Sequence, residues 1–230
     1  MDKYDIVYVL KKDAPADELR YSLRSVCENL PHRHVYFVCG CPEGLKPDFH
    51  IDMEQSGVTV WQKSTSSLVR ICHEKALSDD FWWFNDDFFV MQKMTAETPY
   101  FNGTLFKRVK ELESRYHGCT LYSRQLERLW QMLLDEGYTT WNYAVHVPML
   151  INKRKALATM RKYPDQMMFR SLYGNVNNIG GINHPDVKVF GNKEIPIDAP
   201  FLSTTETSFN DGAVGRYIRE RFPNKCKYEV

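Results

Sequence analysis

The stretch Phe81-Trp82-Trp83-Phe84-Asn85-Asp86-Asp87-Phe88-Phe89-Val90 decides the fold of this chain. Its apolar positions suit a buried β-strand, yet the polar triplet Asn85-Asp86-Asp87 interrupts the aromatic run. Two carboxylates about 4 Å apart repel each other by roughly 4 kcal/mol at an effective dielectric near 20. Such a pair therefore raises a pKa, binds hydrogen-bond donors or holds a cation.

Carboxylate oxygens suit Mg²⁺ or Mn²⁺, so the triplet predicts a divalent-cation site at the end of a hydrophobic strand. Asp86 and Asp87 are the expected metal ligands, and Asn85 is expected to contact the substrate. The alternative interpretation is structural: the strand ends in a turn capped by Asn85 and Asp86, and Asp87 forms a salt bridge. Acids with perturbed pKa values gather at functional sites, which favours the metal interpretation.

The residues around this stretch predict the fold class. Hydrophobic patterns indicate strands and helices in alternation before the aromatic strand. The expected strands are 6–10, 34–39 and 58–62, and the expected helices are 13–30 and 66–77. This order predicts an α/β fold with a mostly parallel central sheet flanked by helices. Ligands of such sheets bind beyond the carboxyl ends of the strands, and the triplet lies near such an end.

The second half of the chain is expected to be more helical. Apolar spacing predicts helices over 105–116 and 122–133, a return strand over 143–151, a basic helix from Asn152 to Lys162 and a last helix capped within 208–211. Residues 173–184 are rich in Asn and Gly and are either a binding lid or an ordinary connection. A short acidic motif at the end of a hydrophobic strand is how many nucleotide-sugar transferases hold a divalent ion against a diphosphate. We therefore expect one domain over 1–230, with a nucleotide-sugar-binding half (1–100) and a helical acceptor half (101–230).

Composition bears on the compartment and on the partners. The 230 residues carry a net charge of +1, and six cysteines show no Cys-x-x-Cys spacing. The charged start is unlike a signal peptide, and no apolar run approaches the ~20 residues of a membrane span. We expect a cytoplasmic protein with reduced thiols. Residues 104–170 hold twelve Lys and Arg against six Asp and Glu, which suits a phosphate-bearing substrate or, alternatively, solvated helix faces.

Several blocks of sequence stand in an order that resembles one known family. They are YDIVYVL (4–10), ELRYSLRSVCENLP (18–31), VYFVCG (35–40), FNDDFF (84–89), His146-Val147-Pro148, FLSTTETSFND (201–211) and RFPNKCKYE (221–229). They resemble the Stealth proteins, which are sugar-phosphate transferases of bacterial capsule synthesis. The resemblance implies a GT-A-like fold and the transfer of a hexose-1-phosphate from a UDP-sugar to a hydroxyl, with a divalent metal.

The same resemblance implies roles for individual residues. It places Asp86 and Asp87 at the metal and the diphosphate, with Asp87 counted among the catalytic residues. It makes His146 a general base or phosphate ligand and Arg170 a phosphate clamp. Transfer at phosphorus depends mostly on positioning and charge neutralisation, which agrees with these residue types.

A second group of residues is expected to complete the site. The resemblance implies that Asn210 and Asp211 contribute to substrate and metal binding and that Arg20 and Arg24 contact the substrate. Each residue also has a structural alternative. Arg20 and Arg24 then pair with Asp17 or Glu28 one helical turn away. His146 is then a core histidine, Arg170 a helix-surface arginine and Asp211 a helix cap.

Other functions stay open on the sequence. The chain departs from the family pattern at Val9-Leu10-Lys11-Lys12 and at Cys226, so hexosyl transfer stands beside hexose-1-phosphate transfer. The hydroxyl acceptor is a glycan, a small molecule or a hydroxylated DNA base, for which the basic middle would contact phosphates. Two further alternatives are a non-catalytic sugar- or nucleotide-binding module and a metal phosphoesterase; the second lacks the expected His/Asp cluster.

Overall fold

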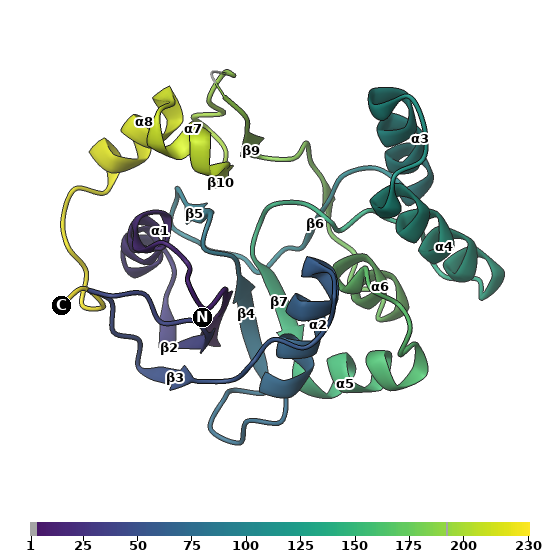
Figure 1. Cartoon of the computed structure of the whole chain (residues 1–230), viewed down its shortest axis with the longest axis horizontal. Coiled ribbons are helices and arrows are strands. Elements are labelled where there is room, and N and C mark those ends of the chain that lie inside the picture. The colour runs from purple at the N-terminus through teal and green to yellow at the C-terminus, as the bar shows by residue number, and fades with distance from the viewer. Residues whose placement is uncertain (1–3, 192) are drawn as a thin grey trace.

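The computed structural model describes residues 4–191 and 193–230, and a five-stranded sheet forms its centre (Figure 1). The strands are β1 (Tyr4–Leu10), β2 (His32–Cys39), β3 (Phe49–Ile51), β4 (Asp80–Phe84) and β7 (Met149–Asn152), in the spatial order β3-β2-β1-β4-β7. The first four run parallel, and β7 pairs antiparallel with β4. The predicted α/β class, with a mostly parallel sheet flanked by helices, is confirmed.

Helices cover both faces of this sheet. Ile6 and Tyr8 of β1 pack with Leu23 and Val26 of α1 (Ala16–Asn29), whereas Val7 belongs to the core on the opposite face. That second core joins α2 (Val60–Ile71), α5 (Lys153–Lys162) and α6 (Phe169–Val176). Because both faces are covered, β1 carries apolar residues without strict alternation.

A helical hairpin projects beside the sheet (Figure 1). It consists of α3 (Leu105–Tyr116) and α4 (Leu121–Asp135), whose apolar faces share a third core with Leu172 of α6. Thr104 and Thr120 cap the two helices by accepting hydrogen bonds from the backbone N–H of Lys107 and Ser123. The helices predicted over 105–116 and 122–133 are confirmed.

A second sheet adjoins α1 and has the order β5-β10-β9. Its strands are β5 (Phe88–Val90), β9 (Lys188–Val189) and β10 (Phe201–Thr204), followed by α7 (Glu206–Asn210) and α8 (Ala213–Arg221). A short pair, β6 (Tyr100–Phe101) and β8 (Ile182–Asn183), completes the strands of the described residues.

A buried polar stripe on α1 holds β5 in place. Ser22 Oγ donates to the carbonyl of Phe88, Ser25 Oγ accepts from the Val90 N–H, and Asn29 Nδ2 donates to the Val90 carbonyl. The three side chains are spaced to lie on one helix face and are 0–3% exposed. The helix thus satisfies backbone groups of a buried strand, and this fixes the position of the segment that follows the acidic triplet.

One predicted strand is wrong. Residues 58–62, predicted as a strand, form the start of α2, where Thr59 and Gln62 make a capping box. The helix therefore spans 60–71 rather than 66–77. The aromatic strand β4 ends before the acidic triplet, as expected, and a turn leads from it into β5, which belongs to a different sheet.

Other boundaries also differ from the expectations. The return strand is limited to β7, and residues 173–176 belong to α6 rather than to a loop. At the C-terminal side, Thr205 caps α7 while Gly212 precedes α8, so the expected cap within 208–211 is wrong. Asn152 caps α5 as predicted. The charged start (residues 1–3) lies outside the described residues.

All six cysteines are free thiols. In the described part of the chain, every helix is too short or too polar to cross a lipid bilayer.

Candidate functional site

The acidic triplet forms a turn at the carboxyl end of β4, closed by a hydrogen bond from the Phe88 N–H to the Asn85 carbonyl (3.4 Å). β2 and β3 extend the sheet on one side of β1, whereas β4 and β7 extend it on the other. The strand order therefore changes direction between β1 and β4. Ligands of open α/β sheets bind at such a switch point, outside the carboxyl ends of the strands. Beside it, a Cβ on Gly40 would lie 1.9 Å from the Lys11 carbonyl oxygen, so only glycine lets the ends of β1 and β2 approach this closely.

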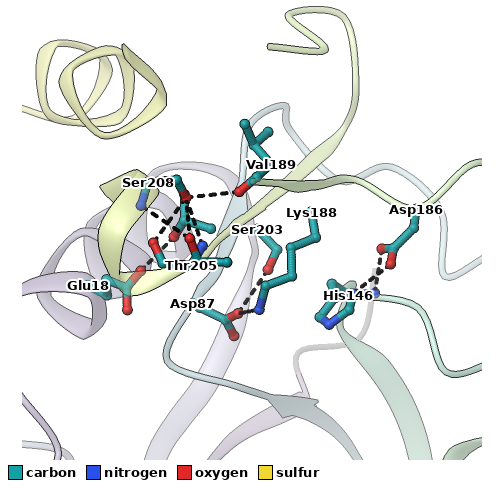
Figure 2. Close-up of polar contacts among 10 residues, drawn as sticks. Glu18, Asp87, His146, Asp186, Lys188, Val189, Ser203, Thr205 and Ser208 are labelled. Atoms are coloured by element: carbon teal, nitrogen blue, oxygen red, sulfur yellow. Dashed lines mark hydrogen bonds and ion pairs between the residues drawn. The ribbon is translucent and has the colours of Figure 1, made fainter. Parts of the chain in front are cut away.

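Asp87 is buried and already has two partners. Lys188 Nζ of β9 lies 2.7 Å from its Oδ2, and Ser203 Oγ of β10 donates to the same oxygen at 2.9 Å (Figure 2). The salt bridge of the structural alternative is therefore present. Its partner comes from the second sheet, so the turn connects the two sheets both covalently and through this ion pair.

Two further carboxylates, those of Asp86 and Glu18, lie close enough to Asp87 for its charge to act on them. Burial raises the pKa of Asp86, and the neighbouring Asp87 raises it further. Burial likewise raises the pKa of Glu18, on α1, to about 7, and the charges of Asp87 and Asp86 add to the shift. Thr204 Oγ1 donates to Glu18 at 2.7 Å. Three acids thus face the nearby cations Lys11 and Lys188, which leaves a negative site.

The donor set fits a divalent ion that is shared with a substrate. Within residues 4–191 and 193–230, no three His, Cys, Asp or Glu side chains are grouped closely enough to enclose a metal. Mg²⁺ rarely needs such a cage, because it keeps waters and is held by one or two carboxylates together with substrate phosphates. Burial and, secondly, the Asp87 carboxylate raise the pKa of the partly buried Asp86, and a cation bound between the two acids would offset both effects. Asp86 and Asp87 therefore fit Mg²⁺ or Mn²⁺ beside a diphosphate.

His146 and Asp186 form a hydrogen-bonded pair near the same turn. His146 Nδ1 lies 2.7 Å from Asp186 Oδ2, and the His146 backbone N–H donates to Oδ1 at 3.0 Å. Burial acts to raise the pKa of Asp186, but the hydrogen bonds and the charge of His146 outweigh it and lower the pKa. The imidazole stands edge-on to the Phe88 ring, and no described residue bonds its Nε2. In Figure 2, Asp186 points toward His146 and Lys188 points toward Asp87, and both residues come from the segment that leads into β9.

The guanidinium of Arg170 packs against the aromatic rings of Trp83 and Phe88. Its guanidinium is 5.3 Å from the Trp83 ring centroid and 5.5 Å from that of Phe88, and it donates to the Val147 carbonyl. Burial lowers the pKa of Arg170 to about 10. Together with Asn85 and His146, it lines a cavity of about 450 Å³ that we call the α2–α6 pocket. The structure thus brings Asn85, His146 and Arg170 of the predicted site to one cavity next to the acidic turn.

Arg20 and Arg24 have a different partner. Arg20 Nη1 lies 3.1 Å from Glu229 Oε2, and Arg24 Nε lies 2.7 Å from Glu229 Oε1. Arg24 also donates to the carbonyls of Phe222 and Pro223. The alternative pairing with Asp17 or Glu28 is wrong in its partners. Both arginines bind the C-terminal segment to α1. Their side chains contact Glu229 rather than the acidic turn.

Asn210 and Asp211 are exposed at the end of α7. Their described hydrogen bonds are made by the backbone: the two carbonyls accept from Arg219 and Arg216, and the Asp211 N–H donates to the Thr207 carbonyl. The predicted set of Asp86, Asp87 and Asp211 is not assembled in the described part of the chain.

Sequence reasoning missed Glu18, Asp186, Lys188 and Ser203. Glu18 and Ser203 lie inside the blocks 18–31 and 201–211, so both stood in segments that resemble the family. Asp186 and Lys188 had no such signal. Their partners are 40 and 101 residues away, so only the pairing of the second sheet brings them to the site.

No family model and no curated protein matches the chain, so the resemblance to the Stealth proteins stays a prediction. Among solved structures, it is similar to the galactosyltransferase LgtC in complex with donor and acceptor sugar analogs, with a TM-score of 0.43, 14% identity and coverage of 98% of this chain and 85% of that one. An active-site mutant of LgtC gives the same values. The glycosyltransferase GlyE of Streptococcus pneumoniae TIGR4 gives a TM-score of 0.40 and 12% identity over 97% of this chain and 50% of that one.

Proposed function

We propose that this protein is a metal-dependent transferase of GT-A-like fold that moves a hexosyl or hexose-1-phosphate group from a UDP-sugar to a hydroxyl acceptor. One observation carries the proposal: the acidic turn at the end of β4 meets the His146–Asp186 pair at the switch point of the central sheet. A cation-binding group and a proton acceptor on either side of one turn are what transfer from a phosphate ester requires.

The donor is assigned to the ends of β1 and β4. Asp86 and Asp87 would hold Mg²⁺ or Mn²⁺, which when bound supplies positive charge for the donor diphosphate. Lys188 lies beside the Asp87 carboxylate and provides a second positive charge at the donor site. Glu18 closes the α1 side of this negative site.

The acceptor is assigned to the His146 side. Its hydroxyl oxygen attacks the donor while His146 Nε2 takes the hydroxyl proton, and Asp186 stabilises the protonated imidazole. In hexosyl transfer, the oxygen bonds to the anomeric carbon and the carbon–oxygen bond to the β-phosphate breaks, which releases UDP. In hexose-1-phosphate transfer, it bonds to the β-phosphorus and the bond to the α-phosphate oxygen breaks, which releases UMP.

The test is incubation with UDP-sugars and Mn²⁺ or Mg²⁺, with and without chelator, followed by identification of the released nucleotide. UDP or UMP distinguishes the two reactions. Asp86→Asn should abolish release, whereas Asp79→Asn, at an exposed acid that pairs with Arg154, should not. Tight UDP binding without release under every condition would support the non-catalytic binding module instead. Hydrolysis of simple phosphodiesters would support the phosphoesterase.

A further inference from the structure

The α2–α6 pocket has a chemistry that the donor site does not explain. Its walls come from α2, the α3–α4 hairpin and α6, and Trp83, Asn85 and Phe88 form the side next to the acidic turn. Its cationic or potentially cationic lining residues are Arg108, His146 and Arg170, while no described Asp or Glu lines it. This charge is opposite to that of the neighbouring acidic turn.

Two buried donors in this pocket have no partner among the described residues. They are Arg170 Nε and Trp83 Nε1, and both are shielded from solvent. Buried donors are nearly always hydrogen-bonded, so an unpaired pair in one cavity indicates that a ligand with acceptor oxygens completes them. Arg170 is a full charge whose only described hydrogen bond goes to the neutral Val147 carbonyl. A ligand that carries negative charge fits these donors better than a neutral one.

The outer wall of the pocket is aromatic. Trp61 of α2 and Tyr122 of α4 stack with a centroid distance of 5.2 Å and an interplanar angle of 23°. Both rings are half-buried, so each keeps surface for contact with a ligand. Arg108 of α3 lines the same pocket and pairs with the exposed Glu111 at 3.4 Å, and its charge also acts on Tyr122 and Asp186. Apolar walls with a few convergent polar groups are typical of small-molecule sites.

We infer that the α2–α6 pocket is the acceptor subsite and takes an anionic saccharide, one that carries a carboxylate or a phosphate. The sugar ring packs against Trp61 and Tyr122, the anionic group binds at Arg170, Trp83 Nε1 and Arg108, and a hydroxyl is presented to His146. The inference rests on the proposed function for the transfer step, whereas binding in the pocket is separable from it.

Isothermal titration in the presence of UDP and Mg²⁺ tests the inference with three probes: glucuronate, glucose 6-phosphate and glucose. We expect at least one anionic probe to bind about ten-fold or more tightly than glucose. Arg108→Gln should remove most of this preference, and the matched variant Arg115→Gln, at an exposed arginine of the same helix, should keep it. Arg170→Lys keeps the charge but lacks Nε, and it should also reduce the preference. Preference for one anion distinguishes the carboxylate from the phosphate.

Equal binding of all three probes, or an anion preference that survives both Arg108→Gln and Arg170→Lys, would overturn the inference. UDP binding and UDP-sugar turnover, measured on the same preparations, report on the donor site independently. Turnover without anion preference would overturn the inferred acceptor subsite and leave the proposed function. Anion preference without any UDP binding would overturn the proposed function and leave the anion-binding pocket.

Discussion

Lys188 places its ammonium group 2.7 Å from the carboxylate of Asp87, on the turn where a divalent ion is expected. The two residues are 101 positions apart: Lys188 lies in β9 of the second sheet, and Asp87 lies in the turn that precedes β5. A single positive charge thus already neutralises part of the acidic turn, and any metal ion that binds Asp87 competes with it.

Lys188→Met should tighten the binding of Mn²⁺ to the free protein several-fold, because the competing charge is removed while Asp86, Asp87 and Glu18 remain. A titration followed by the electron paramagnetic resonance of free Mn²⁺ measures this. Lys193→Met, at an exposed lysine that lies over the Phe190 ring, is the control and should bind Mn²⁺ normally. Weaker binding in Lys188→Met would show that the lysine does not compete with the ion.

His146→Ala should reduce kcat by roughly 10²- to 10⁴-fold, the usual contribution of a general base. Asp186→Asn keeps a hydrogen-bond acceptor beside Nδ1 but removes the negative charge, so it should lower kcat by a smaller factor. Both effects should fall on kcat rather than on UDP affinity, which is measured separately. Unchanged kcat in His146→Ala would show that the histidine is not the general base.

Ser25→Ala should lower the free energy of unfolding by about 1–3 kcal/mol, because the Val90 N–H is left buried without an acceptor. Asn29→Ala should act similarly through the Val90 carbonyl. Urea denaturation measures both variants, with Asp17→Asn at an exposed site of the same helix as control. If the two variants were as stable as the control, α1 would not be holding β5 through these bonds.

Glu229 gives the fold an acid-sensitive contact. Burial acts to raise its pKa, but hydrogen bonds from Arg24, the Cys226 backbone and Arg20 lower it from 4.5 to about 2. A lowered carboxyl pKa stabilises the folded state above pH 4.5, and this stabilisation is lost as the pH falls toward 2. Glu229→Gln should lower the melting temperature at pH 7 and flatten its dependence on pH between 4.5 and 2.

In that experiment, breaking the pair leaves Arg24 buried without a counter-charge, which typically costs about 3–5 kcal/mol. Glu28→Gln removes the exposed pair with Arg221 and serves as the control. Equal melting temperatures for the two variants at pH 7 would contradict the importance of the Glu229 contact.

Local patterns predicted much of the fold. The apolar spacing over 105–116 and 122–133 located α3 and α4, and the strand and helix order located the central sheet. The error at 58–62 arose because Val58 and Val60 favour strands, although both are exposed, at 91% and 62%. Thr59-x-x-Gln62 is a capping box that is readable in the sequence and outweighs them.

The site was less predictable because its partners are distant in the chain. The acidic residues Asp86 and Asp87 stood out through their aromatic flanks. Nothing local shows that Lys188 reaches Asp87 or that Asp186 reaches His146, since both contacts depend on how β9 is placed. Conversely, Arg20 and Arg24 stood out through a family-like block, yet they bind the C-terminal segment.

The pairing of Arg24 with Glu229 has a consequence for biosynthesis. The two residues are 205 positions apart, so at about 5–20 residues per second a ribosome needs roughly 10–40 s to add the second after the first. During that interval, the guanidinium on α1 lacks its counter-charge. The contact between α1 and residue 229 therefore forms only after that residue has been added, and a nascent chain halted earlier leaves the Arg24 guanidinium without it.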